Sequence, residues 1–153
     1  MRIVLQRASH AQVTVDGAVV GALPAPGLVA LVGIHRDDTV AIAEKLAAKV
    51  WGLRVLEGPV DETPESWSRG DVSASDINAP LLVVSQFTLY GDCRKGRRPS
   101  WEMAAKSEVA RPIFDHFVAT LRRLGAHVET GRFGAMMEVS LVNNGPVTLI
   151  VEG

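Results

Sequence analysis

Short apolar runs separated by turn residues open the chain and predict a β-meander. The segments Ile3–Leu5 and Val13–Val15 are predicted strands, and Asp16-Gly17 after the second is a strong signal for a two-residue hairpin turn. The run Gly27–Gly33 is apolar throughout and bounded by glycines, which is typical of a strand covered on both faces. The first third of the chain is therefore expected to open as β-structure.

Two later segments change to the helical period. The first follows N-cap candidates at 37–39 and repeats an apolar residue along one face, at Ile42, Leu46, Val50 and Leu53. The second is predicted over residues 107–124, with Gly125 as its stop and an inner face made of Ile113, Phe114, Phe117, Val118, Leu121 and Leu124. Pro112 leaves the first turn open, because the helix either starts near Arg111 or bends there.

The remaining apolar runs predict further strands. Leu81–Val84 is a buried strand that delivers Ser85–Thr88 to its end, and strands are expected at 127–129, 137–142 and 147–151, the last two joined through 143–146. Residues 57–80 are rich in Pro, Ser, Asp, Glu and Gly, which predicts an extended, partly mobile surface segment. Strands outnumber helices and partly form hairpins. The expected fold is thus an α/β layered sandwich of mixed, largely antiparallel strands with two main helices on one side.

Composition sets the class of the molecule. The 153 residues fit one domain, 1–153, and 47% hydrophobic with 22% charged residues is typical of a soluble globular protein. No apolar run approaches the roughly 18 to 20 residues of a membrane span, and the first residues lack a signal peptide, so we expect a cytoplasmic protein without a membrane partner. The single cysteine, Cys93, allows no internal disulfide.

The charge pattern argues against a general nucleic-acid binder but leaves one basic cluster. The net charge is −1, whereas such binders are strongly basic. Four cations nevertheless surround Gly96, namely Arg94, Lys95, Arg97 and Arg98. This cluster could hold phosphates, although a solvated charged loop is slightly favoured from the sequence alone.

The side chains offer little classical catalytic chemistry. No nucleophile elbow is present, and although Ser85 or Thr88 could be nucleophiles, nothing in the spacing selects a base from His10, His35, His116 and His127. Metal-ligand spacings, Walker loops and dinucleotide-binding loops are missing, so neither a metal nor a cofactor is expected.

What remains is a site made largely of backbone. Amide groups at the strand end Ser85–Thr88 could stabilise an oxyanion, and the small hydroxyl groups there could position a ligand. The Gly145-Pro146 step could form a wall of exposed carbonyl groups if its peptide bond were cis. Taken singly, an ordinary strand end and an ordinary tight turn are the simpler interpretations.

Taken together, four ordered motifs resemble the D-aminoacyl-tRNA deacylases, the D-tyrosyl-tRNA deacylase family. The motifs are MRIVLQR at residues 1–7, continuing to Gly33; LVVSQFTLYGD at 82–92 with KGRRPS at 95–100; TGRFGA at 130–135; and SLVNNGPVT at 140–148. Two departures from the family pattern stand out. The usual Gly-Lys-Met-Asn stretch is missing from 57–80, and Cys93 replaces a common threonine.

The resemblance implies a β/β/α fold of the deacylase type and a homodimer that hydrolyses the ester of D-aminoacyl-tRNA. Glycyl-tRNA is an expected second substrate. The Gly145-cisPro146 motif would enter the partner's active site and reject L-amino acids, while water attacks with help from the 2′-hydroxyl of the terminal ribose. The catalytic segment would be Ser85, Gln86, Phe87 and Thr88, and Phe133 and Met137 would lie around the adenine, although core packing is about equally expected for Met137. The basic cluster would contact tRNA.

Two other classes of function remain open at this point. One is a general esterase with Thr88 or Ser85 as its nucleophile. The other is a non-catalytic tRNA-binding module, which would be expected to have lost the Ser85–Thr88 or the Gly145-Pro146 segment. Both segments are present, so this class is ranked last.

Overall fold

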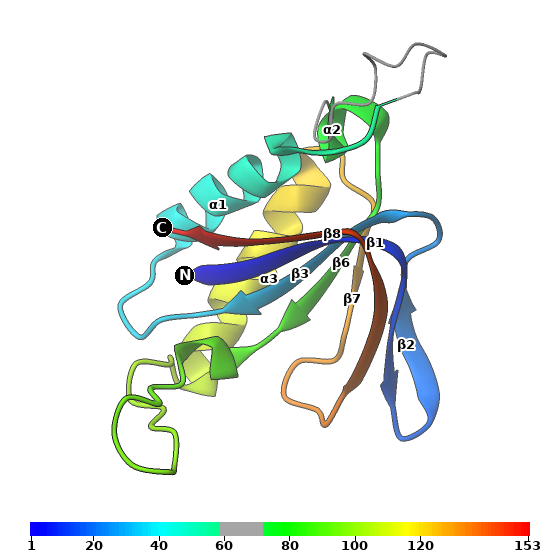
Figure 1. Ribbon diagram of the computed structural model, residues 1–153. Helices are drawn as coiled ribbons and strands as arrows, with labels where there is room; N and C mark the ends of the chain where they lie inside the picture. The colour runs from blue at the N-terminus through cyan, green and yellow to red at the C-terminus, as the bar shows by residue number, and fades with distance from the viewer. Residues whose placement is uncertain (59–71) are drawn as a thin grey trace.

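The computed structural model describes residues 1–58 and 72–153, which form a mixed sheet with helices on one of its faces (Figure 1). The main sheet has the order β2-β1-β3-β6-β7, with β8 on the other edge of β1. Its strands are β1 (Arg2–Val15), β2 (Ala18–Ala22), β3 (Gly27–Gly33), β6 (Leu81–Ser85), β7 (Val128–Thr130) and β8 (Glu138–Glu152). β1 pairs antiparallel with β2, β3 and β8, whereas β3, β6 and β7 run parallel, so the predicted mixed, layered fold is confirmed.

Strand β1 is longer than the sequence predicted. Ile3–Leu5 and Val13–Val15 belong to one strand of 14 residues, so the prediction of two separate strands was wrong. The strand stays paired between them, since Gln6 and Ala8 pair with both β3 and β8 and Gln12 pairs with both β2 and β8. Ala8 and Ala11 are buried. The predicted hairpin turn at Asp16-Gly17 is confirmed, with φ angles of 52° and 78°.

Strand β8 corrects a second prediction. The segments 137–142 and 147–151 were expected to be separate strands joined by a turn, but both halves pair with β1 in one strand of 15 residues. The register runs from Gln6↔Thr148 to Ala8↔Asn143, so residues 144–147 face Arg7 alone. The Gly145-Pro146 step therefore makes a local excursion from the strand and does not reverse the chain.

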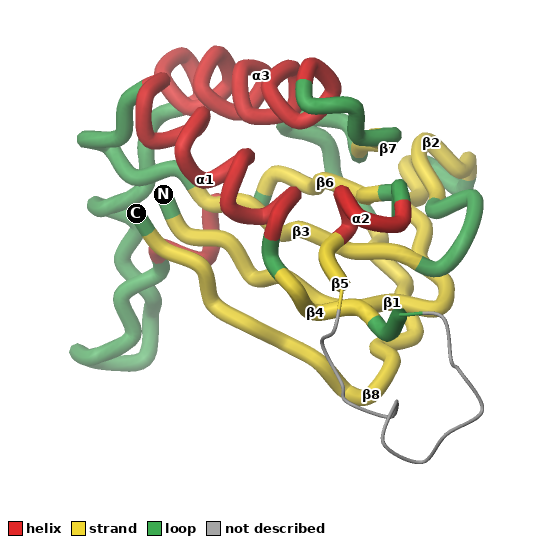
Figure 2. Tube along the Cα trace, turned by 90° about the horizontal axis from the view of Figure 1, so that it is seen from above, coloured by secondary structure: helices red, strands yellow, loops and turns green. Residues whose placement is uncertain are grey.

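The predicted helices form two of the three α-helices in the described residues. Helix α1 (Val40–Gly52) is capped by the Thr39 side chain, whose oxygen accepts a bond from the backbone NH of Ile42 at 3.4 Å. Helix α3 (Ser107–Arg123) starts at Ser107 and continues through Pro112, which settles its open start. Both lie on one side of the sheet (Figure 2). Gly125, with φ of 101°, follows the end of α3, and Leu124 is exposed and not on the inner face as predicted.

The sheet carries an apolar core on each face. The larger core lies between the sheet and the helices and includes Leu46, Phe117 and Leu121. The smaller core lies on the opposite face, where β2 and the first half of β8 curl away from the helices (Figure 1). There β2 approaches β7 so closely that a Cβ on Gly21 would lie 2.2 Å from the Thr130 carbonyl oxygen. This curl produces the second β-layer.

The region predicted as an extended surface segment is partly structured. Residues 59–71 lie outside the described part of the chain. Strand β4 (Arg54–Leu56) pairs with β5 (Val72–Ser73), which leads into the short helix α2 (Ala74–Ile77). Ser73 and Asp76 form a reciprocal capping box, and Ala74 and Ala79 are buried, so the prediction was wrong for residues 72–79. None of the described helices is long and apolar enough to cross a membrane.

Candidate active site

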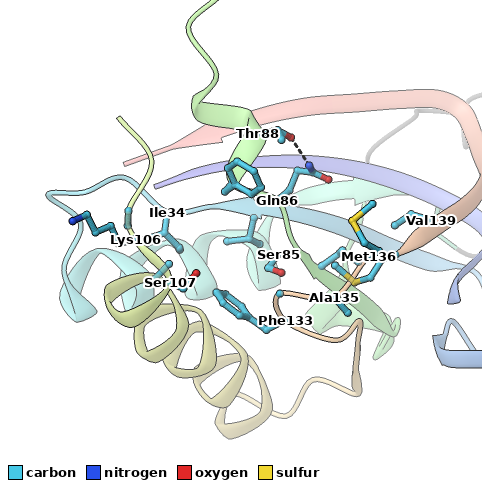
Figure 3. Close-up of a pocket in the computed structure, with 17 residues that line it drawn as sticks. Ile34, Ser85, Gln86, Thr88, Lys106, Ser107, Phe133, Ala135, Met136 and Val139 are labelled. Carbon is cyan, nitrogen blue, oxygen red and sulfur yellow. Dashed lines mark hydrogen bonds between the residues drawn. The ribbon is translucent and has the colours of Figure 1, made fainter. Parts of the chain in front are cut away.

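A cavity of about 600 Å³ opens at the carboxyl ends of the parallel strands β3 and β6. Residues from the end of β6 form one wall, the start of α3 forms another, and residues 133–139 close a third (Figure 3). Ser85, Gln86, Phe87, Thr88, Phe133 and Met137 all line it. The structure thus brings together six of the residues singled out in the sequence, from two segments more than 40 positions apart.

The segment after β6 is fixed to the sheet by backbone contacts. The Gln86 NH donates to the Val32 carbonyl at 2.7 Å, after which the chain enters the 3₁₀ helix η2 (Phe87–Tyr90). Arg2 Nη1 donates to the Leu89 carbonyl at 2.8 Å. Gly33 packs closely against this segment, since a Cβ there would come within 3.0 Å of the Gln86 carbonyl oxygen and of Leu89 Cβ. These contacts hold the start of η2 on a rigid support. The first backbone NH groups of a helix have no hydrogen-bond partner inside that helix, and those of η2 are presented on this support.

Gln86 sets the orientation of the Thr88 hydroxyl group. The Gln86 Nε2 group donates a short hydrogen bond to Thr88 Oγ1 (Figure 3). An amide NH₂ group cannot accept a proton, so this contact leaves the hydroxyl hydrogen of Thr88 available to donate to another group. In the described residues, the side-chain bonds of His35, His116 and His127 go to the Asp37 NH, Glu44 and Glu129. None of the four histidines, His10 included, lines the cavity, so no histidine base is placed to activate Thr88 among the described residues.

Phe133 and Met137 each combine packing with a place in the cavity wall. The Phe133 ring lies 5.7 Å from the Phe114 ring, and the Arg111 guanidinium lies 6.0 Å from its centre. Met137 packs on the smaller core, and a Cβ on Gly131 would lie only 2.6 Å from its sulfur atom. The two interpretations given to Met137, core packing and lining of a site, are thus both compatible with its position.

Several other lining residues were not selected from sequence. Lys106 and Ser107 contribute from the start of α3, and Ala135, Met136 and Val139 from the segment before and within β8. The side chain of Lys106 extends away from Ser85 and Phe133 (Figure 3). The position of Lys106 and Ser107 at the start of a predicted helix was the available signal, since helix starts present backbone NH groups. Met136 could not be selected from the sequence, because a single exposed methionine belongs to no motif or periodic pattern.

Gly145 and Pro146 do not line the cavity of their own chain. They are exposed on the excursion of β8, their peptide bond is cis, and φ of Gly145 is 120°. Beneath them lies Arg7, whose side chain is only 4% exposed. Its Nε donates to the Asn144 carbonyl at 3.0 Å, and its Nη2 pairs with Glu57 at 3.1 Å. Sequence reasoning missed Arg7, because a buried cation inside a strand pattern resembles a solvated one.

The basic cluster lies on a loop that leaves η2 and does not line the cavity. An antiparallel bridge between Asp92 and Ser100 closes the loop. Arg94 folds back on Asp92 with contacts of 2.9 and 2.7 Å, and this hydrogen-bonded pairing lowers the pKa of Asp92 to about 2. Lys95, Arg97 and Arg98 are exposed. The cluster thus has three cations directed to solvent and one that is already paired.

Comparisons with known proteins decide the family. The family model described as D-Tyr-tRNA(Tyr) deacylase matches residues 4–152. The chain belongs to this family. Curated relatives named D-aminoacyl-tRNA deacylase include one from Cutibacterium acnes, 58% identical with coverage of 99% of this chain and 97% of the relative, and one from Thermobifida fusca, 59% identical with 99% coverage of both. The expectation of an enzyme that hydrolyses carboxylic ester bonds is thereby confirmed.

Solved structures agree with the family fold. One titled c-Myc DNA Unwinding Element Binding Protein has a TM-score of 0.89 and 35% identity, covering 100% of this chain and 99% of its own. Another, titled a probable eukaryotic D-amino acid tRNA deacylase, has a TM-score of 0.78 and 18% identity, covering 98% and 97%, and supports the fold alone. Among the described residues of the deacylase, no group of three or more His, Cys, Asp or Glu side chains could hold a metal ion.

Proposed function

We propose that the protein hydrolyses the ester between a D-amino acid and the terminal adenosine of tRNA, and acts on mischarged glycyl-tRNA in the same way. The observation that carries this proposal is the cavity itself. Its polar lining comes mainly from the strand end Ser85–Thr88 and the start of α3, and no histidine base is hydrogen-bonded to Ser85 or Thr88 among the described residues. Family membership supplies the substrate class.

The chemistry then depends on positioning. Water forms the new bond to the ester carbonyl carbon, the bond to the ribose oxygen breaks, and that oxygen leaves with a proton. The 2′-hydroxyl of the terminal ribose assists the attack. The amides of Phe87 and Thr88, at the start of η2, donate to the oxyanion that develops on the carbonyl oxygen. Thr88 donates its hydroxyl hydrogen to substrate, because the bond from Gln86 uses only a lone pair of the Thr88 oxygen and leaves that hydrogen available.

Chirality is selected by rejection across a homodimer in this proposal. Within the described residues β8 pairs only with β1, so its outer edge can receive a second copy. That strand exposes apolar side chains, with Val142 56% and Ile150 67% exposed, which is unusual for a surface strand unless a partner covers it. The exposed Gly145-cisPro146 step of one chain then enters the other chain's cavity, where its backbone clashes with an L side chain. Glycine escapes the clash.

The basic loop completes the proposed substrate contact. Lys95, Arg97 and Arg98 would bind phosphates of the tRNA acceptor stem, with Arg94 holding the loop through Asp92. The cytoplasm, where charged tRNA is used, is the proposed location. A membrane partner is not part of this proposal.

The experiment that tests the proposal is release of D-tyrosine from D-tyrosyl-tRNA by purified protein without added metal, beside a Thr88→Ala variant. We expect rapid release by the wild type and a reduced but measurable rate in the variant. Loss of nearly all turnover in Thr88→Ala would favour the general esterase with a threonine nucleophile. Binding of tRNA without any release would favour the non-catalytic module.

A further inference from the structure

Two aromatic side chains lie exposed beside the cavity. Phe87 is 56% and Trp101 43% exposed, and their rings meet edge to face with centroids 5.3 Å apart at 68°. We call this pair the aromatic face. Large aromatic rings left in water cost free energy, and a paired exposed arrangement is a common mark of a binding surface.

The aromatic face is held in place by the backbone around it. Gly91 lies against the Trp101 ring, since a Cβ on Gly91 would come within 2.7 Å of Trp101 Cζ3. Asp92 and Ser100 exchange two backbone hydrogen bonds, of 2.8 and 2.9 Å, immediately before Trp101. After it, the Ala104 NH donates to the Trp101 carbonyl at 3.0 Å. The ring is therefore presented on an ordered support, which lowers the entropy cost of binding.

The position of the aromatic face relates it to the substrate. On one side Phe87 lines the cavity in which the esterified terminal nucleotide would react. On the other side the loop that carries Trp101 also carries the exposed cations Lys95, Arg97 and Arg98. Exposed rings next to a basic segment are the combination with which proteins bind single-stranded nucleic acid, because bases stack on the rings while cations contact the backbone.

We propose that the aromatic face of Phe87 and Trp101 is a stacking platform for the unpaired nucleotide that precedes the terminal adenosine of the RNA. This inference rests on the proposed function and adds a contact outside the reaction centre. Stacking is tolerant of base identity, so the platform favours an ordered, single-stranded 3′ end and reads no sequence. Trp101 acts as a positioning residue, whereas Phe87 also belongs to the cavity wall.

The test uses three substrates that carry the same D-tyrosyl ester: adenosine alone, a trinucleotide ending in adenosine, and intact tRNA. Steady-state rates are measured for the wild type, Trp101→Ala, Trp101→Phe and Leu124→Ala. Leu124 is a matched control, because it is 42% exposed and lies at the far end of α3. Thermal melting and size-exclusion chromatography accompany each variant.

We expect Trp101→Ala to raise KM for the trinucleotide and for tRNA by about 5- to 100-fold, with kcat and the adenosine ester nearly unchanged. Trp101→Phe should recover most of the loss, and Leu124→Ala should behave as the wild type. Unchanged KM for the trinucleotide would overturn the platform while leaving the deacylase function intact. An equal loss on all three esters, or a change in oligomeric state, would also overturn it, because either would assign Trp101 to folding or to a protein interface. No release by the wild type from any ester would remove the proposed function itself.

Discussion

The guanidinium group of Arg7 occupies the space that a side chain on Gly145 would need. A Cβ built on Gly145 would lie 2.7 Å from Arg7 Nη2, well inside van der Waals contact. The same guanidinium donates to the carbonyl of Asn144, the residue just before Gly145. Arg7 therefore supports the β8 excursion from below and requires glycine at its apex. A buried cation thus sets the position of an exposed backbone step.

Gly145→Ala should displace the excursion. The φ of 120° at Gly145 is rarely adopted by L side chains, and the new Cβ would clash with Arg7. We expect a loss of about 1 to 3 kcal/mol in the free energy of unfolding, measured by urea denaturation. Selectivity for D over L esters should fall more steeply than stability. A variant with wild-type selectivity would contradict a role for this step in rejection.

Mixing two defective chains tests whether the step acts across subunits. One chain carries Gly145→Ala and keeps its cavity, while the other carries Ala135→Trp, which places an indole in the cavity wall, and keeps its Gly145-Pro146 step. If the step serves the partner, subunit exchange at equal amounts should restore selective sites in about a quarter of cavities. Mixtures that gain no selective sites although mixed dimers form would show that each chain depends on its own step.

Arg7→Met should loosen the same excursion while preserving side-chain bulk. The substitution removes the hydrogen bond to Asn144 and the ion pair with Glu57. We expect about 1 to 3 kcal/mol lower stability and increased hydrolysis of L-tyrosyl-tRNA relative to the wild type. Glu57→Gln is the matched control, because it weakens the ion pair but leaves the bond to Asn144. If both variants lost selectivity equally, the support would come from the ion pair and not from the carbonyl contact.

The basic loop should depend on the ionised form of Asp92. Hydrogen bonding to Arg94 lowers the pKa of this carboxyl to about 2, below its value in an unfolded chain. The contribution to loop order is therefore fully present above the unfolded pKa, near 4, and is lost as the pH falls through about 2. Carbon-13 NMR should place the Asp92 titration midpoint near 2 in the wild type and near 4 in Arg94→Ala. A normal midpoint in both proteins would contradict the pairing.

The exposed cations of the loop should differ from Arg94 in their effect on tRNA binding. Neutralising Arg97 and Arg98 together should weaken binding. It should also reduce the slope of log K against log salt concentration by the equivalent of up to about two phosphate contacts. Arg94→Ala should change the salt slope less, because the Arg94 charge is already paired with Asp92. Filter binding over a range of salt concentrations measures both slopes. Equal slopes for the wild type and the double variant would remove the loop from the tRNA interface.

The sequence predicted most elements because their local patterns were unambiguous. The Asp16-Gly17 turn, an N-cap within 37–39 and the Gly125 stop each have a short-range physical cause, and all three are confirmed, the cap at Thr39. The continuity of β8 could not be predicted, because whether a Gly-Pro step reverses a chain depends on pairing with β1 more than 130 positions away. Pro112 was ambiguous for a similar reason, since tertiary packing of α3 decides whether the helix continues.

The candidate site was predictable only where residues formed a motif. Ser85–Thr88, Phe133 and Met137 were selected from sequence and lie around one cavity, although their roles remain proposals. Three contacts could not be predicted, because they follow from geometry that no spacing rule encodes. They are the bond from Arg7 to Asn144, the bond from Gln86 to Thr88 and the pairing of Arg94 with Asp92. These contacts determine which polar groups remain available, so they change the chemistry more than the motif does.

The most direct test of the account is the ratio of kcat/KM for D-tyrosyl-tRNA and L-tyrosyl-tRNA, prepared on the same tRNA and measured with the same purified protein. A backbone wall that clashes with an L side chain predicts a preference for the D ester of at least about 100-fold. Equal hydrolysis of the two esters would contradict chiral rejection and would leave a general esterase.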